Sequence, residues 1–585
     1  MQNLRAKIRA ASFIRDEEAL KDLLPLASCQ TDRTKIARHA TEMVTQLRKS
    51  AHPSVMELFL MEYGLSSEEG VALMCLAEAL LRVPDGTTID ALIEDKIAPS
   101  QWRKHLGESP SKFINASSWA LFFTGKVLSV PEQGIASLLR VAVKRLGEPV
   151  IRQAVAHLMR EMGQQFVLGE TIQGALKRAR KARASTVYHS YDMLGEAAMH
   201  EQDARAYHMA YADAIAQIAK AATSSDPRLN PGLSIKLSAL HPNYDPLHRQ
   251  QVLSELAPRL LSLAVLAKSA NIGMNIDAEE AARLDLSLDV IERVLSNPSL
   301  ADWDGFGVVV QAYGKRAAFV IDWLYALSKH LNRRIMVRLV KGAYWDSEIK
   351  LAQAEGLPGF PVYSAKHHTD ISFICCAAKL FDMSDRIYPQ FATHNAHTIA
   401  AILHLAQKKY VTDFEFQRLH GMGEALHLQV TNTFGTPCRV YAPVGQHRDL
   451  LAYLVRRLLE NGANSSFVNQ IFDASVASRL VAADPFDKLG MSGPALKHPQ
   501  DLFAPERQNS TGYDLSNPDL LERLQSARTT PGRWSFGQEG AIRQVHNPAT
   551  GKSLGQVRFL SPEQTQEKIN AAQPWGVASR ERATI

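Results

Sequence analysis

Eight short apolar segments alternate with helix-length stretches between about residues 230 and 475, and this alternation limits the possible folds more than any other feature. Such a pattern is typical of parallel strands joined by helices, and eight repeats favour a closed (β/α)₈ TIM barrel of the α/β class. The candidate strands are GLSIKLSAL (232–240), GMNIDAEE (273–280), FGVVVQAY (306–313), RIMVRLVKGAYW (334–345), YPQFATHN (388–395), FEFQRLH (414–420), CRVYAPVG (438–445) and SSFVNQ (465–470).

The part of the chain before the barrel has helical patterns and no strand alternation. Residues 31–50 have helical spacing after a Thr/Asp start, and residues 66–86 begin with Ser-Ser-Glu-Glu and end at Pro-Asp-Gly. We predict a helical arm over 1–50 and a helical domain over 51–185, followed by the barrel domain over 186–478.

The C-terminal part changes in composition. Residues 479–534 are rich in Pro, Asp, Asn and Ser, which predicts an extended linker. Residues 543–560 predict a β-hairpin with a Pro-Ala-Thr-Gly turn, and a helix is expected from about residue 562. Because the sequence ends within this helical pattern, we interpret 535–585 as the truncated start of another domain.

The composition is that of a globular protein, with 46% hydrophobic and 22% charged residues. A net charge of +6 over 585 residues is small, and the dense basic run at 177–183 is interpreted as a solvated helix face. Five cysteines without CxxC spacing indicate reduced thiols. No apolar run reaches the ~20 residues of a membrane span, and the N-terminus lacks a signal-peptide core. We expect a cytoplasmic location, with at most peripheral contact with the inner membrane.

Polar side chains end or follow nearly every candidate strand. A polar residue at one strand end is common, but in (β/α)₈ barrels the active site lies at the C-terminal ends of the strands. Repeated placement around the barrel therefore predicts a functional rim. These residues are Lys236, Asp277, Gln311, Arg338, His394, Asn395, His420 and Tyr441.

The predicted rim gathers four cations, which are Lys236, Arg338, Arg456 and Arg457. A charge in an apolar strand, such as Arg338, must be paired or bind a ligand. Ion pairing is one alternative, and its candidate partners are Asp277, Glu196 and Glu460. An anionic ligand or cofactor is the other, since guanidinium groups bind carboxylate and phosphate through paired hydrogen bonds.

The segment YSAKHHTD (363–370) is expected to open a helix, with Ser364, Lys366 and Thr369 in or beside its first turn. Free backbone N–H groups at a helix start attract phosphate, which would suit the pyrophosphate of a nucleotide cofactor. Ordinary helix capping explains the same residue types. No GxGxxG sequence follows a strand, so a Rossmann cofactor fold is not supported.

A metal-dependent barrel hydrolase is the alternative function. Its candidate ligands are His241, Asp277, His394, His397 and His420. The first candidate strand lacks the His-x-His that commonly starts such a centre, and neither a GxSxG elbow nor a cysteine beside a base is present. A third, non-enzymatic reading is DNA binding through 177–183. Chemistry that rests on a bound cofactor fits the residues better.

The chain also resembles a known family. The motifs GLSIKLSAL, MNIDAEEA, VVQAY, VRLVKGAYWD, FATHNAHT, FEFQRLHGMGE, RVYAPVG and LVRRLLENGANSSFV together are similar to the proline dehydrogenase domain of the bifunctional flavoenzyme family proline utilization A. SYDMLGEAA (190–198) and PERQNSTGYDLS (505–516) extend the resemblance to most of the chain. RQVHNPATGKSLGQV looks like the start of the family's second enzyme, an NAD-dependent glutamate-semialdehyde dehydrogenase.

The resemblance implies a distorted barrel that binds FAD, oxidises L-proline to 1-pyrroline-5-carboxylate and passes electrons to membrane ubiquinone, the first step from proline to glutamate. Arg456, Arg457 and Lys236 would hold the proline carboxylate. The pyrrolidine ring would pack on Tyr441, Tyr344 and Leu419. Asp277 would orient Tyr441 and the arginines, and Glu196 would pair with Arg456 as a gate.

The resemblance also implies a set of cofactor contacts. Gln311 and Arg338 would touch the isoalloxazine, with Arg338 near flavin N5. The other implied contacts are Val340, Gly342, Trp345, Ser364, Lys366, Thr369, Thr393, His394, Asn395, Glu460 and Ser466. No metal is implied.

The sequence departs from some family members in two ways. Residues 1–50 contain no short basic strand ahead of a helix pair, so we expect no ribbon-helix-helix segment and no nucleic-acid partner. NAD would serve only the second domain, most of which lies beyond Ile585, so its activity is not expected here. The full-length protein is expected to form oligomers.

Overall fold

The computed structural model describes mainly residues 1–28, 32–50, 167–181 and 187–446 and, with short gaps, 470–578. The described chain forms two compact units, Met1–Asn517 and Pro518–Ile585. The first holds the barrel, and each unit is treated by itself.

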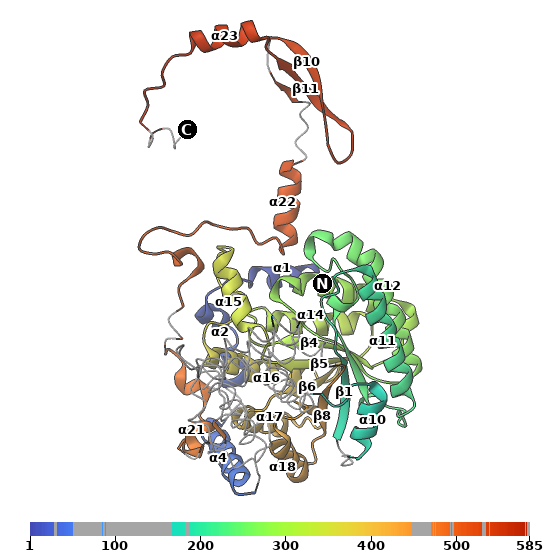
Figure 1. The fold of residues 1–585 in the computed structure, drawn as a ribbon. Helices are drawn as coiled ribbons and strands as arrows, with labels where there is room; N and C mark the ends of the chain where they lie inside the picture. The colour runs from blue at the N-terminus through green and yellow to red at the C-terminus, as the bar shows by residue number, and fades with distance from the viewer. Residues whose placement is uncertain are drawn as a thin grey trace, which may run out of the picture. The chain divides into compact units, whose positions relative to one another are not determined.

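Eight parallel strands close into a barrel in sequence order, as the sequence predicts (Figure 1). The strands are β1 (Val187–Met193), β2 (Gly232–Ile235), β3 (Met274–Ile276), β4 (Phe306–Gln311), β5 (Ile335–Val340), β6 (Ile387–Ala392), β7 (Glu415–Leu419) and β8 (Cys438–Val444). The last strand pairs with the first, with Ser190 opposite Tyr441. Closure leaves no unpaired barrel edge.

The strand assignment from sequence is wrong by one place. Strand β1 lies inside the predicted barrel domain (186–478) but was not among the candidate strands, and the segment Gly232–Ile235, interpreted as the first strand, is the second. Polar residues interrupt the apolar sequence pattern of β1. Ser190 and Asp192 face other polar groups inside the barrel. The barrel closes without 465–470, of which all but Gln470 lies outside the described residues.

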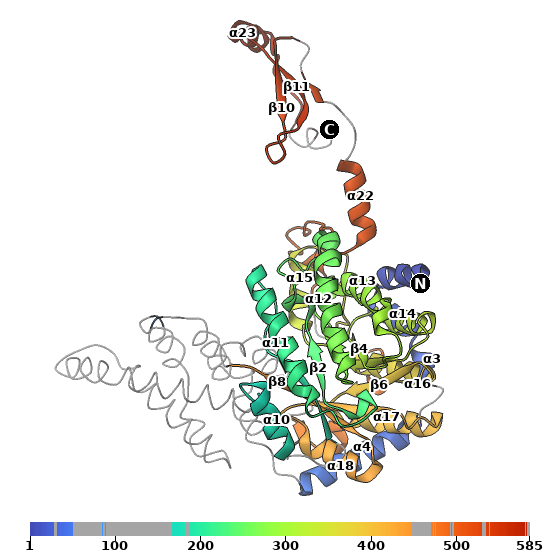
Figure 2. The same ribbon diagram turned by 90° about the vertical axis from the view of Figure 1, so that its right-hand side faces the viewer.

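Helices cover the outside of the barrel, and Figures 1 and 2 show α11 to α14 along one side of it. The helices of this layer are α10 (Ile172–Lys181), α11 (Glu201–Ala219), α12 (Arg249–Ser269), α13 (Leu284–Leu295), α14 (Ala317–His330), α15 (Trp345–Ala354), α16 (Lys366–Asp382), α17 (Ala396–Lys409) and α18 (Glu424–Phe434). The basic run begins on the exposed face of α10, which confirms a solvated helix face for residues 177–181.

The N-terminal arm lies along this helical layer. It consists of α1 (Gln2–Ala10), α2 (Asp16–Lys21), α3 (Leu24–Ser28) and α4 (Arg33–Ser50). Helix α1 packs on α14, α2 and α3 pack on α16, and α4 packs on α17 and α18. The buried Arg5 guanidinium binds Asp285 at 2.7 Å and Asp289 at 2.8 Å. The arm is therefore held by ion pairs as well as by apolar packing.

The region predicted as an extended linker contains short helices. In the first unit these are α21 (Ser478–Val481) and two 3₁₀ turns, and the second unit begins with α22 (Pro518–Arg528). The predicted hairpin is confirmed as β10 (Ala541–His546) and β11 (Ser553–Phe559), which pair antiparallel. Strand β9 (Trp534–Phe536) pairs with β11, and α23 (Pro562–Ala571) starts where the sequence predicted a helix.

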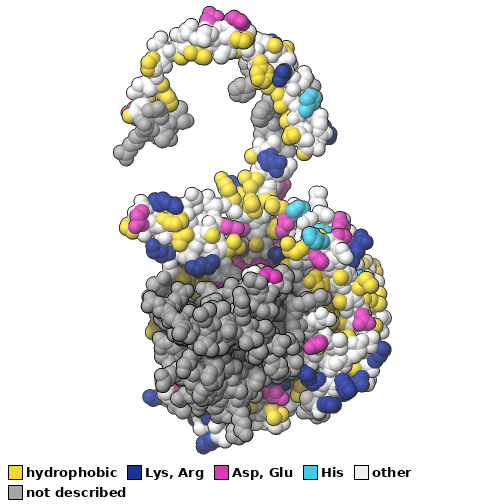
Figure 3. Space-filling view, viewed as in Figure 1, with side chains coloured by type: hydrophobic (Ala, Val, Ile, Leu, Met, Phe, Trp, Pro, Cys, Tyr) yellow, Lys and Arg dark blue, Asp and Glu magenta, His cyan; other side chains and the backbone are white. Residues whose placement is uncertain are grey.

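The described surface is mixed in charge. In Figure 3, Lys and Arg side chains are interspersed with Asp and Glu over the part of this face that the structure describes. Among the described helices, none is long and apolar enough to cross a bilayer. Cys375, Cys376 and Cys438 are free and buried, in line with the expectation of reduced thiols.

Candidate active site at the barrel mouth

One carboxylate links three of the residues that the sequence predicts for the site. Asp277, which directly follows β3, accepts a hydrogen bond from Arg338 Nη1 at 2.9 Å on one oxygen and from Tyr441 Oη at 2.7 Å on the other. Lys236 Nζ lies 3.8 Å from the same carboxylate. Arg338 comes from β5 and Tyr441 from β8, so the closed barrel brings distant parts of the chain to one point.

The principal partner of Lys236 is a residue that sequence reasoning missed. Lys236 Nζ lies 2.5 Å from Asp192 Oδ1, and the Asp192 side chain has no exposed surface. Burial alone would lower the pKa of the Lys236 ammonium, but the negative charge of Asp192, with Asp277 further away, raises this pKa well above the ordinary value. Lys236 is therefore a cation throughout the neutral pH range.

Arg338 is fixed by three acceptors. Besides Asp277, its Nη2 donates to Ser234 Oγ at 3.1 Å and to Ser190 Oγ at 3.3 Å. Its guanidinium carbon lies 5.3 Å from the centroid of the Tyr441 ring. Among the described residues, Arg338 Nε has no hydrogen-bond partner. The guanidinium is thus held rigidly, with its Nε left without a protein partner among the described residues.

The floor under this network is a second polar layer. Glu415 accepts hydrogen bonds from Arg439 Nε at 2.8 Å, Gln417 Nε2 at 2.8 Å and Gln390 Nε2 at 2.9 Å. Gln390 Oε1 in turn accepts from Asn275 at 2.9 Å. Such stacked layers of inward side chains are typical of this fold.

The loops that follow the first three strands are tied together. Ser238 Oγ accepts from Ala197 N at 3.0 Å, and Ser238 N donates to Glu279 at 3.0 Å. Gln311, the last residue of β4, donates to the Glu279 carbonyl at 2.7 Å, while among the described residues its Oε1 has no partner. Glu196 lies half-buried in the first of these loops, three residues after β1.

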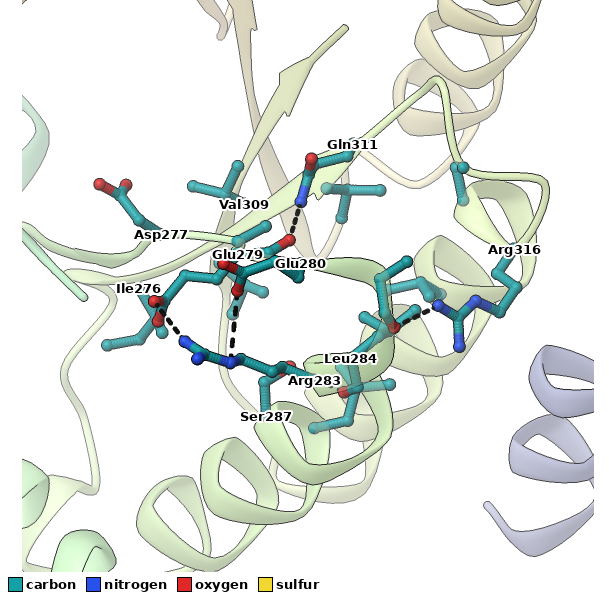
Figure 4. A pocket seen from close by; sticks show the side chains of 18 of the residues that line it. Ile276, Asp277, Glu279, Glu280, Arg283, Leu284, Ser287, Val309, Gln311 and Arg316 are labelled. Atoms are coloured by element: carbon teal, nitrogen blue, oxygen red, sulfur yellow. Dashed lines mark hydrogen bonds and ion pairs between the residues drawn. The ribbon is translucent and has the colours of Figure 1, made fainter. Parts of the chain in front are cut away.

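A small cavity of about 50 Å³ extends from these loops toward α13 and α14, enough for a few water molecules. Figure 4 shows Arg283 paired with both Glu279 and Glu280, and Gln311 reaching the Glu279 backbone from the opposite side. Burial raises the pKa of the Glu279 carboxyl although Arg283 opposes this shift. In the same view the Asp277 carboxylate points away from this group and toward the barrel network.

The predicted cofactor residues on the β5 side form a turn. Val340 ends β5, and Gly342 has a φ of +137°, where a Cβ atom would lie 2.4 Å from the Tyr313 ring. Only glycine fits there. Tyr344 is the N-cap residue of α15, and Trp345 Nε1 donates to the Tyr363 carbonyl at 2.8 Å.

Ser364, Lys366 and Thr369 lie at the start of α16, as predicted. Lys366 and Thr369 are in its first turn, and burial lowers the pKa of the Lys366 ammonium although Asp370 opposes this shift. The Ser364 hydroxyl and backbone N–H both donate to Asp16 of the arm at 2.8 Å. Sequence reasoning missed Asp16, because no local pattern connects it with α16.

The predicted residues after β6 have partners within the protein. His394 Nε2 accepts from Leu419 N at 3.1 Å, which places its ring proton on Nδ1. Asn395 Oδ1 caps α17 by accepting from Thr398 N at 3.0 Å. Thr393 is buried, and its carbonyl accepts from His427 Nε2 at 2.9 Å. The other predicted residues, Arg456, Arg457, Glu460 and Ser466, lie outside the described residues.

The metal alternative lacks support in the described structure. Among the described residues, no three His, Cys, Asp or Glu side chains are grouped so that they could hold a metal ion. Burial lowers the pKa of His420 to about 4, with Arg418 adding to the shift. His420 is therefore neutral at physiological pH.

Comparison with known proteins assigns the family. A family model described as proline dehydrogenase matches residues 175–470, and one described as the DNA-binding domain of proline dehydrogenase matches residues 55–166. Proline dehydrogenase 1 of Bacillus subtilis (strain 168) is 30% identical over 318 residues, which cover 54% of this chain and 92% of that protein. The chain belongs to the proline dehydrogenase family.

Longer relatives match nearly the whole chain. The bifunctional protein PutA of Klebsiella aerogenes is 49% identical over 578 residues, which cover 93% of this chain and 44% of the relative. The crystal structure of a mutant of Bradyrhizobium japonicum proline utilization A has a TM-score of 0.70 at 45% identity and covers 91% of this chain and 53% of its own. The chain therefore spans about half the length of these bifunctional relatives.

Proposed function

We propose that this chain is an FAD-dependent proline dehydrogenase that oxidises L-proline to 1-pyrroline-5-carboxylate. The observation that supports this most is the network around Asp277, which joins Arg338 and Tyr441 beside Lys236 in a chain of the proline dehydrogenase family. All four are residues that the family resemblance implies for substrate and cofactor.

The substrate carboxylate needs more positive charge than the described network supplies. Lys236 and Arg338 are paired with the carboxylates of Asp192 and Asp277, so these four charges balance. Proline would place a carboxylate in this region. We therefore assign the neutralising charge to Arg456 and Arg457, with Lys236 as a third, fixed cation.

The residues present fit a flavin. The Gln311 oxygen and Arg338 Nε are buried polar atoms without partners among the described residues, and Gly342 keeps the β5 turn clear of a side chain. The start of α16, with Lys366 and Thr369, provides N–H groups and positive charge for the pyrophosphate. When bound, FAD accepts the hydride from the ring carbon beside the proline nitrogen.

The chain's own residues would position the substrate and remove water. Asp277 orients the Tyr441 phenol by accepting its hydrogen bond. The phenol stays neutral because burial raises its pKa well above the usual range. Tyr344, Leu419 and the Tyr441 ring would pack the pyrrolidine. A dry site beside cations favours the neutral amine that hydride loss requires.

Several properties follow from the same proposal. Electrons would pass to ubiquinone during peripheral contact of a cytoplasmic protein with the inner membrane, as the first step from proline to glutamate. Glu196 would gate the site by pairing with Arg456. The NAD-dependent second activity and oligomer formation are proposals for a longer protein, because the chain spans about half of its bifunctional relatives.

The flavin spectrum tests the proposal. Purified protein should be yellow, and anaerobic L-proline should bleach its absorbance. Arg456→Met should raise the KM for L-proline far more than it weakens FAD retention, because a guanidinium that binds carboxylate is lost. Colourless protein that cannot be loaded with FAD would contradict the proposal, and an unchanged KM would contradict the carboxylate clamp.

DNA binding is a second candidate function, favoured by the description of the family model that matches residues 55–166. The sequence predicted no nucleic-acid partner. Titration of the full chain with a labelled DNA duplex at two salt concentrations tests whether the chain binds DNA. Affinity that falls steeply with salt supports binding to DNA phosphates. No binding at low salt supports the original prediction.

A further inference from the structure

Asp16 of the N-terminal arm is a buried carboxylate at the start of α16. Its Oδ2 accepts hydrogen bonds from Ser364 N and Ser364 Oγ, both at 2.8 Å, and from His368 Nδ1 at 2.9 Å. Its Oδ1 lies 3.1 Å from Lys315 Nζ. Asp16 and Ser364 are 348 residues apart in the sequence.

These contacts are strong enough to keep the carboxylate ionised although its side chain is only 8% exposed. Burial by itself would raise the pKa of Asp16, but hydrogen bonds from His368 and Ser364 and the charge of Lys315 hold it well below its usual range. Lys315 Nζ also donates to the Ile14 carbonyl at 2.7 Å, so the same cluster binds the arm backbone.

The segment that Asp16 holds leads directly into the first turn of α16. Tyr363 N donates to the Tyr313 carbonyl at 2.8 Å, and the Tyr363 carbonyl accepts from Trp345 Nε1 at 2.8 Å. Ala365, the N-cap residue of α16, provides no side-chain cap. The arm carboxylate fixes Ser364 just before Lys366, and His368 just before Thr369.

A second contact of the arm reaches the same region. Phe13 packs against the apolar cluster of Tyr313, Ile349, Phe360 and Val362, as does Trp345. Trp345 is an implied cofactor contact and also binds the segment before α16. The arm therefore contacts the segment before α16 through both Asp16 and Phe13.

We infer that Asp16 is a positioning residue for the FAD site, which makes the N-terminal arm part of cofactor binding. The inference rests on the proposed function, since it takes Lys366 and Thr369 as the groups that meet the cofactor. Asp16 acts through Ser364 and His368, which set where the first N–H groups of α16 point. Without Asp16, the helix start moves more freely and the cofactor site loses its preformed geometry.

The test compares FAD affinity among arm variants of the full chain. Apoprotein is titrated with FAD, and flavin fluorescence gives the dissociation constant. Asp16→Ala should raise it about tenfold or more, the order expected when charged hydrogen bonds are lost. Asp16→Asn should give a smaller rise, since one amide oxygen remains. At saturating FAD, the KM for L-proline should stay within about twofold of wild type, because the substrate residues are untouched.

Two controls separate positioning from general loss of stability. Glu18→Gln removes an exposed carboxylate two residues away and should leave the FAD dissociation constant unchanged. Arg5→Gln breaks the ion pairs of α1 with Asp285 and Asp289, so it should lower the melting temperature without raising that constant. An equal rise in Arg5→Gln and Asp16→Ala would overturn the inference, as would wild-type affinity in Asp16→Ala.

Hydrogen exchange supplies a readout that does not need flavin. In the apoprotein, amides of residues 362–370 should exchange faster in Asp16→Asn than in wild type, while those of α12 should not change. Equal exchange at 362–370 in the two proteins would overturn the inference. Wild-type protein that binds no FAD contradicts the proposed function, and the exchange comparison then still decides whether Asp16 orders this segment.

Discussion

The barrel mouth and the junction between the arm and α16 both bury a carboxylate among polar groups, but they are assembled differently. Asp277 receives its partners from β5 and β8, whose positions are fixed once the barrel closes. Asp16 receives its partners from Ser364, His368 and Lys315, which all lie outside the N-terminal arm. The first site should therefore control substrate kinetics, and the second should control cofactor retention and stability.

Asp192→Asn should have the largest effect, because it leaves Lys236 buried without its partner. Breaking a buried ion pair costs about 3–5 kcal/mol of unfolding free energy. Urea unfolding at neutral pH measures this loss. As a control, Glu201→Gln removes a partly exposed carboxylate that pairs with Arg205 and Arg259 near the surface, and it should cost less than about 1 kcal/mol. Equal losses in the two variants would show that Asp192 does not hold Lys236.

The same variant should change the pH dependence of substrate binding. In the wild type, Asp192 keeps the pKa of Lys236 raised, so the cation persists into the alkaline range. In Asp192→Asn, burial lowers this pKa with less charge to oppose it. The KM for L-proline should then begin to rise at a lower pH than in wild type. Superimposable pH profiles would contradict the assigned role of Lys236.

Asp277→Ala should mainly affect the substrate, which sharpens the contrast with Asp16. The change removes the shared acceptor of Arg338 and Tyr441, so two groups lose their orientation. We expect kcat/KM for L-proline to fall by about 100-fold, or roughly 3 kcal/mol. The FAD dissociation constant should change less than in Asp16→Ala. If the FAD dissociation constant changed more in Asp277→Ala than in Asp16→Ala, the two regions would not have separate roles in substrate and cofactor binding.

The sequence predicted most of the barrel because strand and helix periodicity is local information. The candidate strands before 465–470 fall on β2 to β8. Strand β1 was missed because its inward residues are polar, which removes the apolar run that marked the others. Its aromatic and β-branched residues, Val187, Tyr188 and Tyr191, were the remaining signal.

The candidate site was predictable to the extent that its residues end the strands. Lys236 and Asp277 follow their strands directly, and the resemblance implied Asp277 as the residue that orients Tyr441. Asp192 could not be predicted, because its role depends on β1 lying beside β2 in the closed barrel. Asp16 was even harder to predict, since nothing near it in the sequence indicates α16 as its partner.

Acid should weaken the junction through Asp16. The folded-state pKa of Asp16 lies below its unfolded value, so its stabilisation is present above the unfolded pKa of about 4 and is lost as the pH falls further. We expect Asp16→Asn to lose about 2 kcal/mol at pH 7 relative to wild type, with the difference shrinking below pH ~4. Urea unfolding across this pH range tests the prediction, and a constant difference would contradict it.

Tyr441→Phe should have the smallest effect, because it removes one hydrogen bond and keeps the ring. The phenol donates to Asp277 at 2.7 Å, while the ring lies 5.3 Å from the Arg338 guanidinium carbon. Loss of one hydrogen bond corresponds to about 1 kcal/mol, or roughly a fivefold fall in kcat/KM. Tyr388→Phe is the matched control on the barrel floor, where the phenol lies 3.3 Å from Glu415, and it should change kcat/KM less. A fall as large as that of Asp277→Ala would mean that the phenol, and not the carboxylate, organises the barrel mouth.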